Sequence, residues 1–100
     1  MPFHDYASIP DSAGKPVTQA AQLVRWQVAE GTYVQPETEI AIIQRDDIQY
    51  SLRICFPALI EKQLAVAGSM IPPDKSILRW VADGENIPYG KAYFRTEPKA

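Results

Sequence analysis

The sequence predicts an all-β domain: a flattened barrel or sandwich of two quasi-symmetric antiparallel sheets. Three observations carry this prediction. Apolar residues alternate with polar ones over several short runs, prolines and glycines separate the runs, and one segment recurs. Residues 31–40, GTYVQPETEI, return without a gap as residues 68–77, GSMIPPDKSI, at an offset of 37 (68 − 31). Because one turn chemistry is used twice, we expect one stretch of backbone to be built twice.

The first half of the chain is expected to hold three strands after an entry segment. Residues 1–16 contain three prolines and are predicted to be an extended entry segment rather than a regular element. Residues 22–29 alternate in polarity, and residues 39–44 are a compact β-branched run. Residues 48–56 alternate most cleanly, with Ile48, Tyr50, Leu52, Ile54 and Phe56 on one face and Gln49, Ser51, Arg53 and Cys55 on the other.

The second half is predicted to follow the same order. Residues 59–67 fit a strand or an amphipathic helix equally well, and the repeat favours the strand because it places them on residues 22–29. Residues 77–81 form the next strand, and Asp83-Gly84 is a hairpin-turn dipeptide opposite the polar tip Asp46-Asp47. Residues 87–94 are expected as an edge strand and residues 95–100 as a frayed tail. Residues 17–94 would then form one domain with repeats at 22–44 and 59–81.

Composition narrows the class of protein. One hundred residues are enough for a single core. The formal charge is −2 with acids and bases interspersed, which gives no basic footprint for nucleic acid. The N-terminus has no signal-peptide pattern, and no apolar run approaches the roughly 20 residues that span a bilayer. A lone cysteine, Cys55, fits a reducing compartment. We therefore expect a cytoplasmic domain with no membrane insertion and no nucleic-acid partner.

The order of these segments resembles the biotinyl/lipoyl attachment domain family, most closely the lipoyl domains of 2-oxo-acid dehydrogenase acyltransferase subunits. The resemblance covers about residues 9–84. It implies a flattened barrel of two quasi-symmetric sheets, as the repeat also suggests. The matching pieces are Ile9-Pro10-Asp11, Val17-Thr18, Arg25-Trp26-Gln27-Val28, Glu30-Gly31-Thr32, Pro57, and Gly68 with Ile71.

The resemblance also implies a lysine at the tip of the central hairpin, whose amine would carry lipoate or biotin. Counting forward from residues 40–43 places that lysine at Asp47, and counting backward from Pro57 places it at Gln49. Neither is a lysine, and no lysine occurs between Lys15 and Lys62. Lys75 follows an aspartate, but the repeat places it in a proline turn rather than at a tip. We therefore expect no cofactor.

Other chemically capable residues are expected to be structural. His4 and Cys55 are the only residues of their kinds, so a four-ligand nitrogen and sulfur metal site cannot be assembled. Asp46 and Asp47 could act as an acid/base pair, but a convex tip has no cleft and favours a solvated turn. The chain has no triad on a plausible scaffold, no phosphate loop and no zinc spacing. We expect no enzyme, and core or rim packing for Trp26 and Trp80.

The predicted function is that of a non-catalytic, unmodified biotinyl/lipoyl-like domain that acts as a protein-interaction module with an unknown protein partner. Two alternatives remain: a lipoate or biotin carrier with a displaced lysine, and a lipoyl-like part of a larger transport or secretion assembly. The family's partners read the central hairpin, which makes its tip the candidate contact: Arg45, Asp46, Asp47, Ile48 and Gln49.

Overall fold

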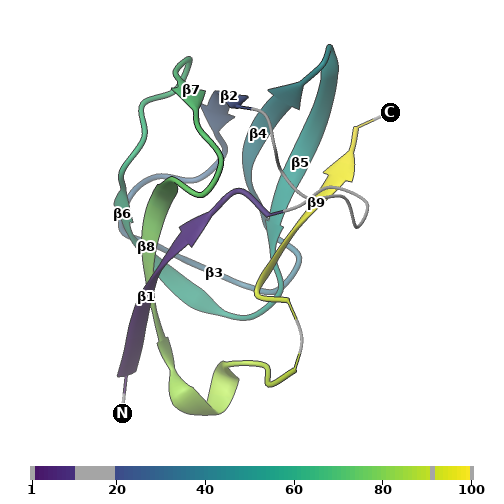
Figure 1. The fold of residues 1–100 in the computed structure, drawn as a ribbon. Helices are drawn as coiled ribbons and strands as arrows, with labels where there is room; N and C mark the ends of the chain where they lie inside the picture. The colour runs from purple at the N-terminus through teal and green to yellow at the C-terminus, as the bar shows by residue number, and fades with distance from the viewer. Residues whose placement is uncertain (1, 11–19, 91, 100) are drawn as a thin grey trace.

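The computed structural model describes residues 2–10, 20–90 and 92–99, and these residues build nine strands and one 3-10 helix (Figure 1). The elements are β1 (Pro2–Ser8), β2 (Ala21–Trp26), β3 (Thr32–Val34), β4 (Glu39–Arg45), β5 (Ile48–Ile54), β6 (Ala58–Gln63), β7 (Met70–Ile71), β8 (Ser76–Asp83), η1 (Gly84–Asn86) and β9 (Phe94–Pro98).

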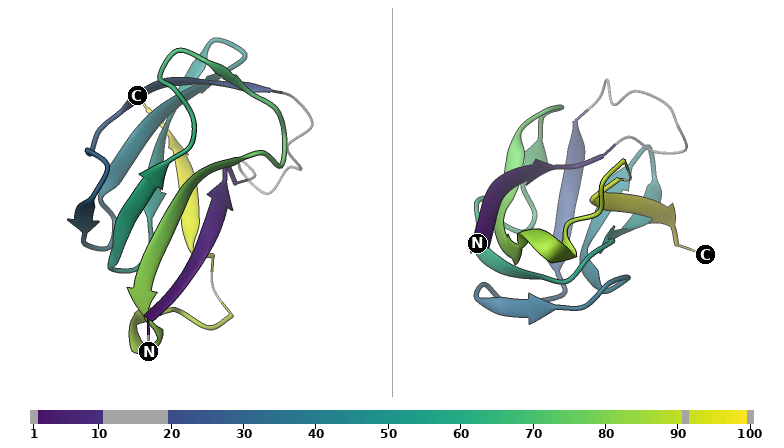
Figure 2. Two further views of the ribbon diagram at one scale, coloured as in Figure 1. Left: turned by 90° about the vertical axis from the view of Figure 1, so that its left-hand side faces the viewer. Right: turned by 90° about the horizontal axis from the view of Figure 1, so that it is seen from below.

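The strands form two antiparallel sheets that pack face to face (Figure 2). One sheet has the order β1-β8-β6-β3 and the other has the order β7-β2-β4-β5-β9. The predicted all-β fold of two quasi-symmetric antiparallel sheets is confirmed. The two sheets are a sandwich, because the described strands do not close into a barrel.

The pairing of the two halves follows the offset of 37. Each bridge between β2 and β4 has a counterpart between β6 and β8 at positions 37 higher. Each pair also has a bulge, which follows Leu23 in β2 and Ile60 in β6. The bridges of β2 with β7 correspond in the same way to those of β6 with β3. Segment 58–63 is therefore a strand, and the helical alternative for residues 59–67 is wrong.

Side chains also cross between the halves in matching pairs. The indole N–H of Trp26 donates to the carbonyl oxygen of Ala65 at 3.0 Å. At the position 37 residues later, the amide of Gln63 donates to the carbonyl oxygen of Val28 at 2.8 Å. Two chemically different side chains thus satisfy equivalent backbone oxygens. A buried or half-buried carbonyl oxygen needs a hydrogen-bond donor. This explains why Gln63, whose amide is a donor, stands where the first repeat has Trp26.

The turns of the two halves share their backbone. Gly31 and Gly68 have φ of +89° and +92°, a region that glycine enters without steric cost. Pro36 and Pro73 are each followed by a residue with positive φ, Glu37 at 69° and Asp74 at 66°. A proline followed by a residue with positive φ is the arrangement of a type II turn, which normally prefers glycine at the second position. Both turns therefore hold a side chain where glycine would be relaxed.

The core lies between the sheets and is aliphatic, with an aromatic end. Its aliphatic side chains come from both repeats, and Ile40 and Ile77 are both fully buried. At one end the Phe56 ring meets the Trp80 ring edge-on, with centroids 4.9 Å apart. Phe94 completes this end of the core. Trp80 is thus a core residue, whereas Trp26 is only half-buried.

The two ends of the chain differ from the prediction. Residues Pro2–Ser8 are not a mere entry segment but the strand β1, which pairs along its length with β8. Residues Phe94–Pro98 are not a frayed tail but the strand β9, which pairs with β5. Both strands lie at sheet edges and pair with one neighbouring strand only. An edge strand can be largely exposed on both faces, so its apolar and polar residues need not alternate. The predicted entry residues 11–16 lie outside the described residues.

The region after β8 also differs from the prediction. Asp83-Gly84 does not form a hairpin turn; Gly84–Asn86 form the 3-10 helix η1. The strand expected over residues 87–94 begins only at Phe94. The chain must travel from the sheet of β8 to the sheet of β9, so no adjacent antiparallel strand follows to close a hairpin.

Candidate functional site

The candidate tip is the turn between β4 and β5, which projects from one end of the molecule (Figure 1). Arg45 and Ile48 form the last bridge of the hairpin, so Asp46 and Asp47 are a two-residue turn. Their φ angles are 50° and 65°, as type I′ hairpin turns require. Both aspartates are exposed. Forward counting from residues 40–43 thus leads to the turn itself.

Two further predicted tip residues lie on β5. Gln49 is bridged to Gln44, and its carbonyl oxygen accepts a hydrogen bond from the Lys99 N–H at 2.9 Å. Gln49 is therefore a strand residue beside the turn rather than the turn residue. Ile48 shares the apolar face of the predicted strand with Leu52 and Ile54, yet it is 47% exposed because the sandwich core ends before the tip. The exposed side chains of the tip are thus two carboxylates, the apolar side chain of Ile48 and the carboxamide of Gln49.

None of the described lysines is a residue of this turn, although the backbone of Lys99 is hydrogen-bonded to Gln49 beside it. Lys62 is on β6, and Lys99 contacts the carboxylate of Glu39. Lys75 closes the turn after β7, where its N–H donates to the carbonyl oxygen of Pro72 at 3.3 Å. Lys75 corresponds to Thr38 of the first repeat, whose N–H closes the equivalent proline turn. The sequence predicts this placement of Lys75. Lys15 lies outside the described residues.

A half-buried carboxylate, that of Glu39, stabilises the hairpin that carries the tip. The Ser51 hydroxyl donates to Glu39 at 2.7 Å and the Gln27 amide donates to it at 2.9 Å. The Lys99 ammonium lies 3.2 Å from both Glu39 oxygens. Burial alone raises the pKa of Glu39, but these hydrogen bonds and the Lys99 charge outweigh it and lower the pKa to about 2. The bond from Ser51 to Glu39 also satisfies the Ser51 hydroxyl, which is buried although Ser51 lies on the polar face of the predicted strand.

A second polar group joins the proline turn to β9. Arg95 forms an ion pair with Glu37, and its hydrogen bond is the main reason that the pKa of Glu37 is lowered. Cys55 lies nearby and is half-buried. Burial, followed by the Glu37 charge, raises the pKa of the Cys55 thiol, while Arg95 opposes the rise. The thiol is therefore protonated at neutral pH and is a poor nucleophile.

Metal and membrane features are not found in the described part of the chain. No group of three or more histidine, cysteine, aspartate or glutamate side chains there could hold a metal ion. His4 is an exposed residue of β1. No helix among the described residues is long and apolar enough to cross a bilayer.

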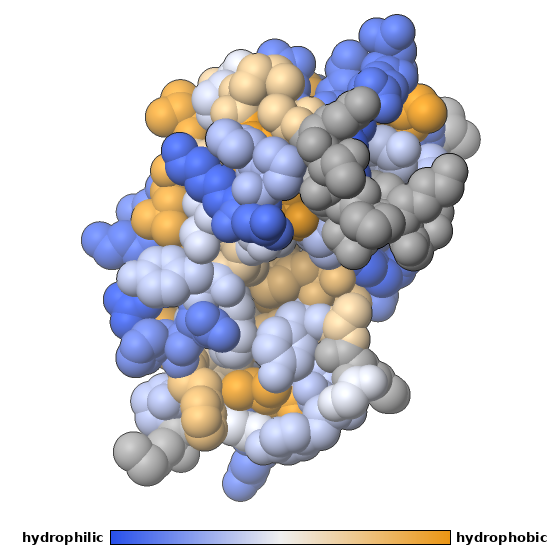
Figure 3. Space-filling model, in the orientation of Figure 1, coloured by the Kyte–Doolittle hydropathy of each residue, from blue (hydrophilic) through white to orange (hydrophobic). Residues whose placement is uncertain are grey.

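The sequence prediction missed two neighbouring hollows at the end opposite the tip. They lie between β1, η1 and the segment that leads into β9, and Tyr89 borders both. The tip projects as a largely hydrophilic group of residues, and apolar residues are exposed among polar ones toward η1 (Figure 3). The sequence does contain one signal for these hollows, because tyrosine and phenylalanine residues are concentrated near the two chain ends. These residues could be predicted to lie together only if β1 and β9 were both recognised as strands.

Comparisons of the chain with protein-family models, with curated proteins and with solved structures found no match.

Proposed function

We propose that this chain is a non-catalytic protein-interaction module with the design of a biotinyl/lipoyl domain but without its cofactor, and that the β4–β5 tip contacts the partner. The observation that carries the proposal is the tip turn: Asp46 and Asp47 occupy the two positions with positive φ. A lysine at this place would be the acceptor for lipoate or biotin. A carboxylate cannot form the same amide, so the tip can be recognised but not loaded.

The energetics of the turn support a role in recognition. Type I′ turns prefer Asn-Gly or Asp-Gly, because two residues with positive φ are costly for most side chains. Here the second position is Asp47, which keeps a charge where glycine would be more stable. Surfaces that give up stability in this way are typical of functional positions. The exposed Ile48 beside them supplies an apolar contact of the kind that protein partners bury.

Affinity capture from the native cells tests the proposal. The bait with Asp46→Asn and Asp47→Asn removes both charges, and asparagine tolerates the left-handed conformation. Asp74→Asn is the matched control, because Asp74 is also exposed and has φ of 66° but lies outside the tip. We expect the tip variant to lose a partner that wild type and the control retain. Capture that is unchanged in the tip variant would remove the tip from the interface.

A further inference from the structure

Four exposed aromatic side chains gather at the end of the molecule opposite the tip. In the described part of the chain, five aromatic side chains are strongly exposed, and all but Tyr33 line the two hollows: Phe3 at 53%, Tyr6 at 55%, Tyr89 at 83% and Tyr93 at 37%. They come from β1 and from the segment before β9, so the fold rather than local sequence brings them together. Clustered exposed aromatic surface of this kind marks a binding site more often than a free surface.

The first hollow, of about 430 Å³, has an apolar floor and tyrosine walls. Trp80 and Phe94 form the floor and are 3% and 7% exposed. Tyr6 on β1 and Tyr93 before β9 stand beside them. Tyr93 is held edge-on against Trp80 at 5.9 Å and against Phe56 at 5.4 Å. The hollow is therefore preformed, and a ligand would spend little free energy on ordering it.

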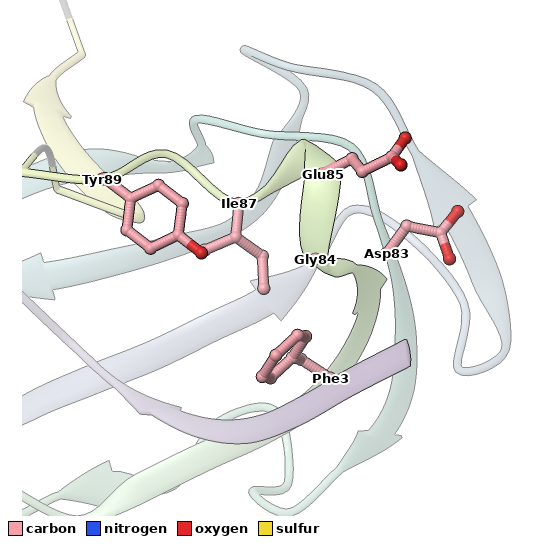
Figure 4. Close-up of a pocket in the computed structure, with 6 residues that line it drawn as sticks. All are labelled: Phe3, Asp83, Gly84, Glu85, Ile87 and Tyr89. Carbon is pink, nitrogen blue, oxygen red and sulfur yellow. The ribbon is translucent and has the colours of Figure 1, made fainter. Parts of the chain in front are cut away.

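The second hollow, of about 670 Å³, shares Tyr89 with the first, and the acidic residues Asp83 and Glu85 are among those that line it (Figure 4). The rings of Phe3 and Tyr89 converge on Ile87 from β1 and from the loop. The carboxylates of Asp83 and Glu85 lie on the other side of Gly84 and point outward. Neither makes an ion pair with another described residue. The groove thus runs from aromatic to anionic surface.

We propose that this groove binds a proline-rich segment of another protein in the polyproline II conformation, with an arginine or lysine directed to Asp83 and Glu85. Proline rings pack well on exposed tyrosine faces, and a polyproline II segment is already extended, so it loses little entropy on binding. The two carboxylates attract a basic residue at one end of the segment and fix its direction. This site shares no residue with the tip.

The edge of β1 argues against the addition of a partner strand at this groove. The N–H of Tyr6 donates to the carboxylate of its neighbour Asp5 at 2.7 Å. This amide is therefore already satisfied within the chain, and a partner strand would have to displace it. Side-chain docking on the aromatic surface needs no such displacement.

Fluorescence anisotropy with the labelled peptide Arg-Pro-Leu-Pro-Pro-Leu-Pro tests the proposal on the full chain. We expect saturable binding that Tyr6→Ala and Tyr89→Ala each weaken about ten-fold. Tyr33→Ala is the matched control, because Tyr33 is 54% exposed on β3 and lies outside the groove; it should leave binding unchanged. The double variant Asp83→Asn/Glu85→Gln should weaken binding about five-fold, and only for the peptide that carries arginine.

Three results would overturn the proposal. They are the absence of saturable binding by wild type, an equal loss in the Tyr33 and Tyr6 variants, and equal binding of a peptide whose prolines are replaced by alanine. Unfolding in urea confirms that each variant is folded. Tip capture is measured with different variants, so failure of the groove and failure of the tip are distinguishable.

Discussion

Replacement of Asp47 by glycine should make the protein more stable and weaken its recognition by a partner. Asp47 has φ of 65° in the two-residue turn. The left-handed region costs an L-residue about 1–2 kcal/mol, of which aspartate recovers part through local hydrogen bonding. Glycine removes the cost but adds about 0.5–1 kcal/mol of unfolded-state entropy. The balance is a gain of at most about 0.5–1 kcal/mol, or up to roughly 2–8 °C in Tm for a domain of this size.

Urea unfolding and affinity capture, made on the same samples, check both parts of this prediction. Asp74→Gly is the matched variant, since Asp74 has φ of 66°, is exposed and lies in the type II turn after β7. It should gain the same stability and keep the partner. A loss of more than about 0.5 kcal/mol in both variants would refute the assignment of strain to these aspartates. Equal capture by Asp47→Gly and wild type would refute the role of the Asp47 charge.

Three further predictions concern the scaffold. Gly31→Ala and Gly68→Ala should each cost about 1 kcal/mol in urea unfolding, because an added Cβ meets no atom within 4 Å and only φ is strained; clearly unequal costs would contradict the quasi-symmetry. Phe56→Ala should cost about 3–5 kcal/mol, since Phe56 is 2% exposed and contacts the aromatic end of the core. Glu39→Gln should lower the free energy of unfolding by about 2 kcal/mol at pH 7. This is less than the value obtained by converting the whole pKa shift into free energy, because solvent at the partly exposed site screens the interactions. The folded pKa of Glu39 is about 2 against 4.5 ordinarily, so its stabilisation is complete above about pH 4.5 and is lost as the pH falls toward 2. The difference between wild type and variant should narrow over that window, and a constant difference would contradict the assignment.

Strands that pair with a neighbour on both sides could be predicted from the sequence. One face of such a strand is buried, and this makes apolar and polar residues alternate along it. This class comprises β5, the strands β2 and β4 in the first repeat, and the strands β6 and β8 in the second. The short edge strands β3 and β7 inside the repeats were not predicted. The tip could be predicted as well, since its polar residues interrupt two strands that must pair with each other. The turns around Gly31 and Gly68 followed from the same repeat.

The chain ends could not be predicted in this way. β1 is an edge strand whose first five residues are all exposed, so its sequence has no alternation to detect. Its partner strand β8 is distant in the sequence: Phe3 pairs with Ala82, more than seventy residues further along the chain. The aromatic groove depends on that pairing and on β9 together. Its residues become neighbours only through long-range contacts that local pattern does not contain.

The most direct test of the central claim is the intact mass of this chain purified from the cells that make it, with their own ligases present. The account predicts the mass of the unmodified sequence, because the proposed likeness to a biotinyl/lipoyl domain places the carrier's lysine in this hairpin turn, and the turn residues are Asp46 and Asp47. A lipoyl- or biotinyl-sized increment, mapped by peptide sequencing to any lysine, would contradict it and favour a carrier with a displaced lysine.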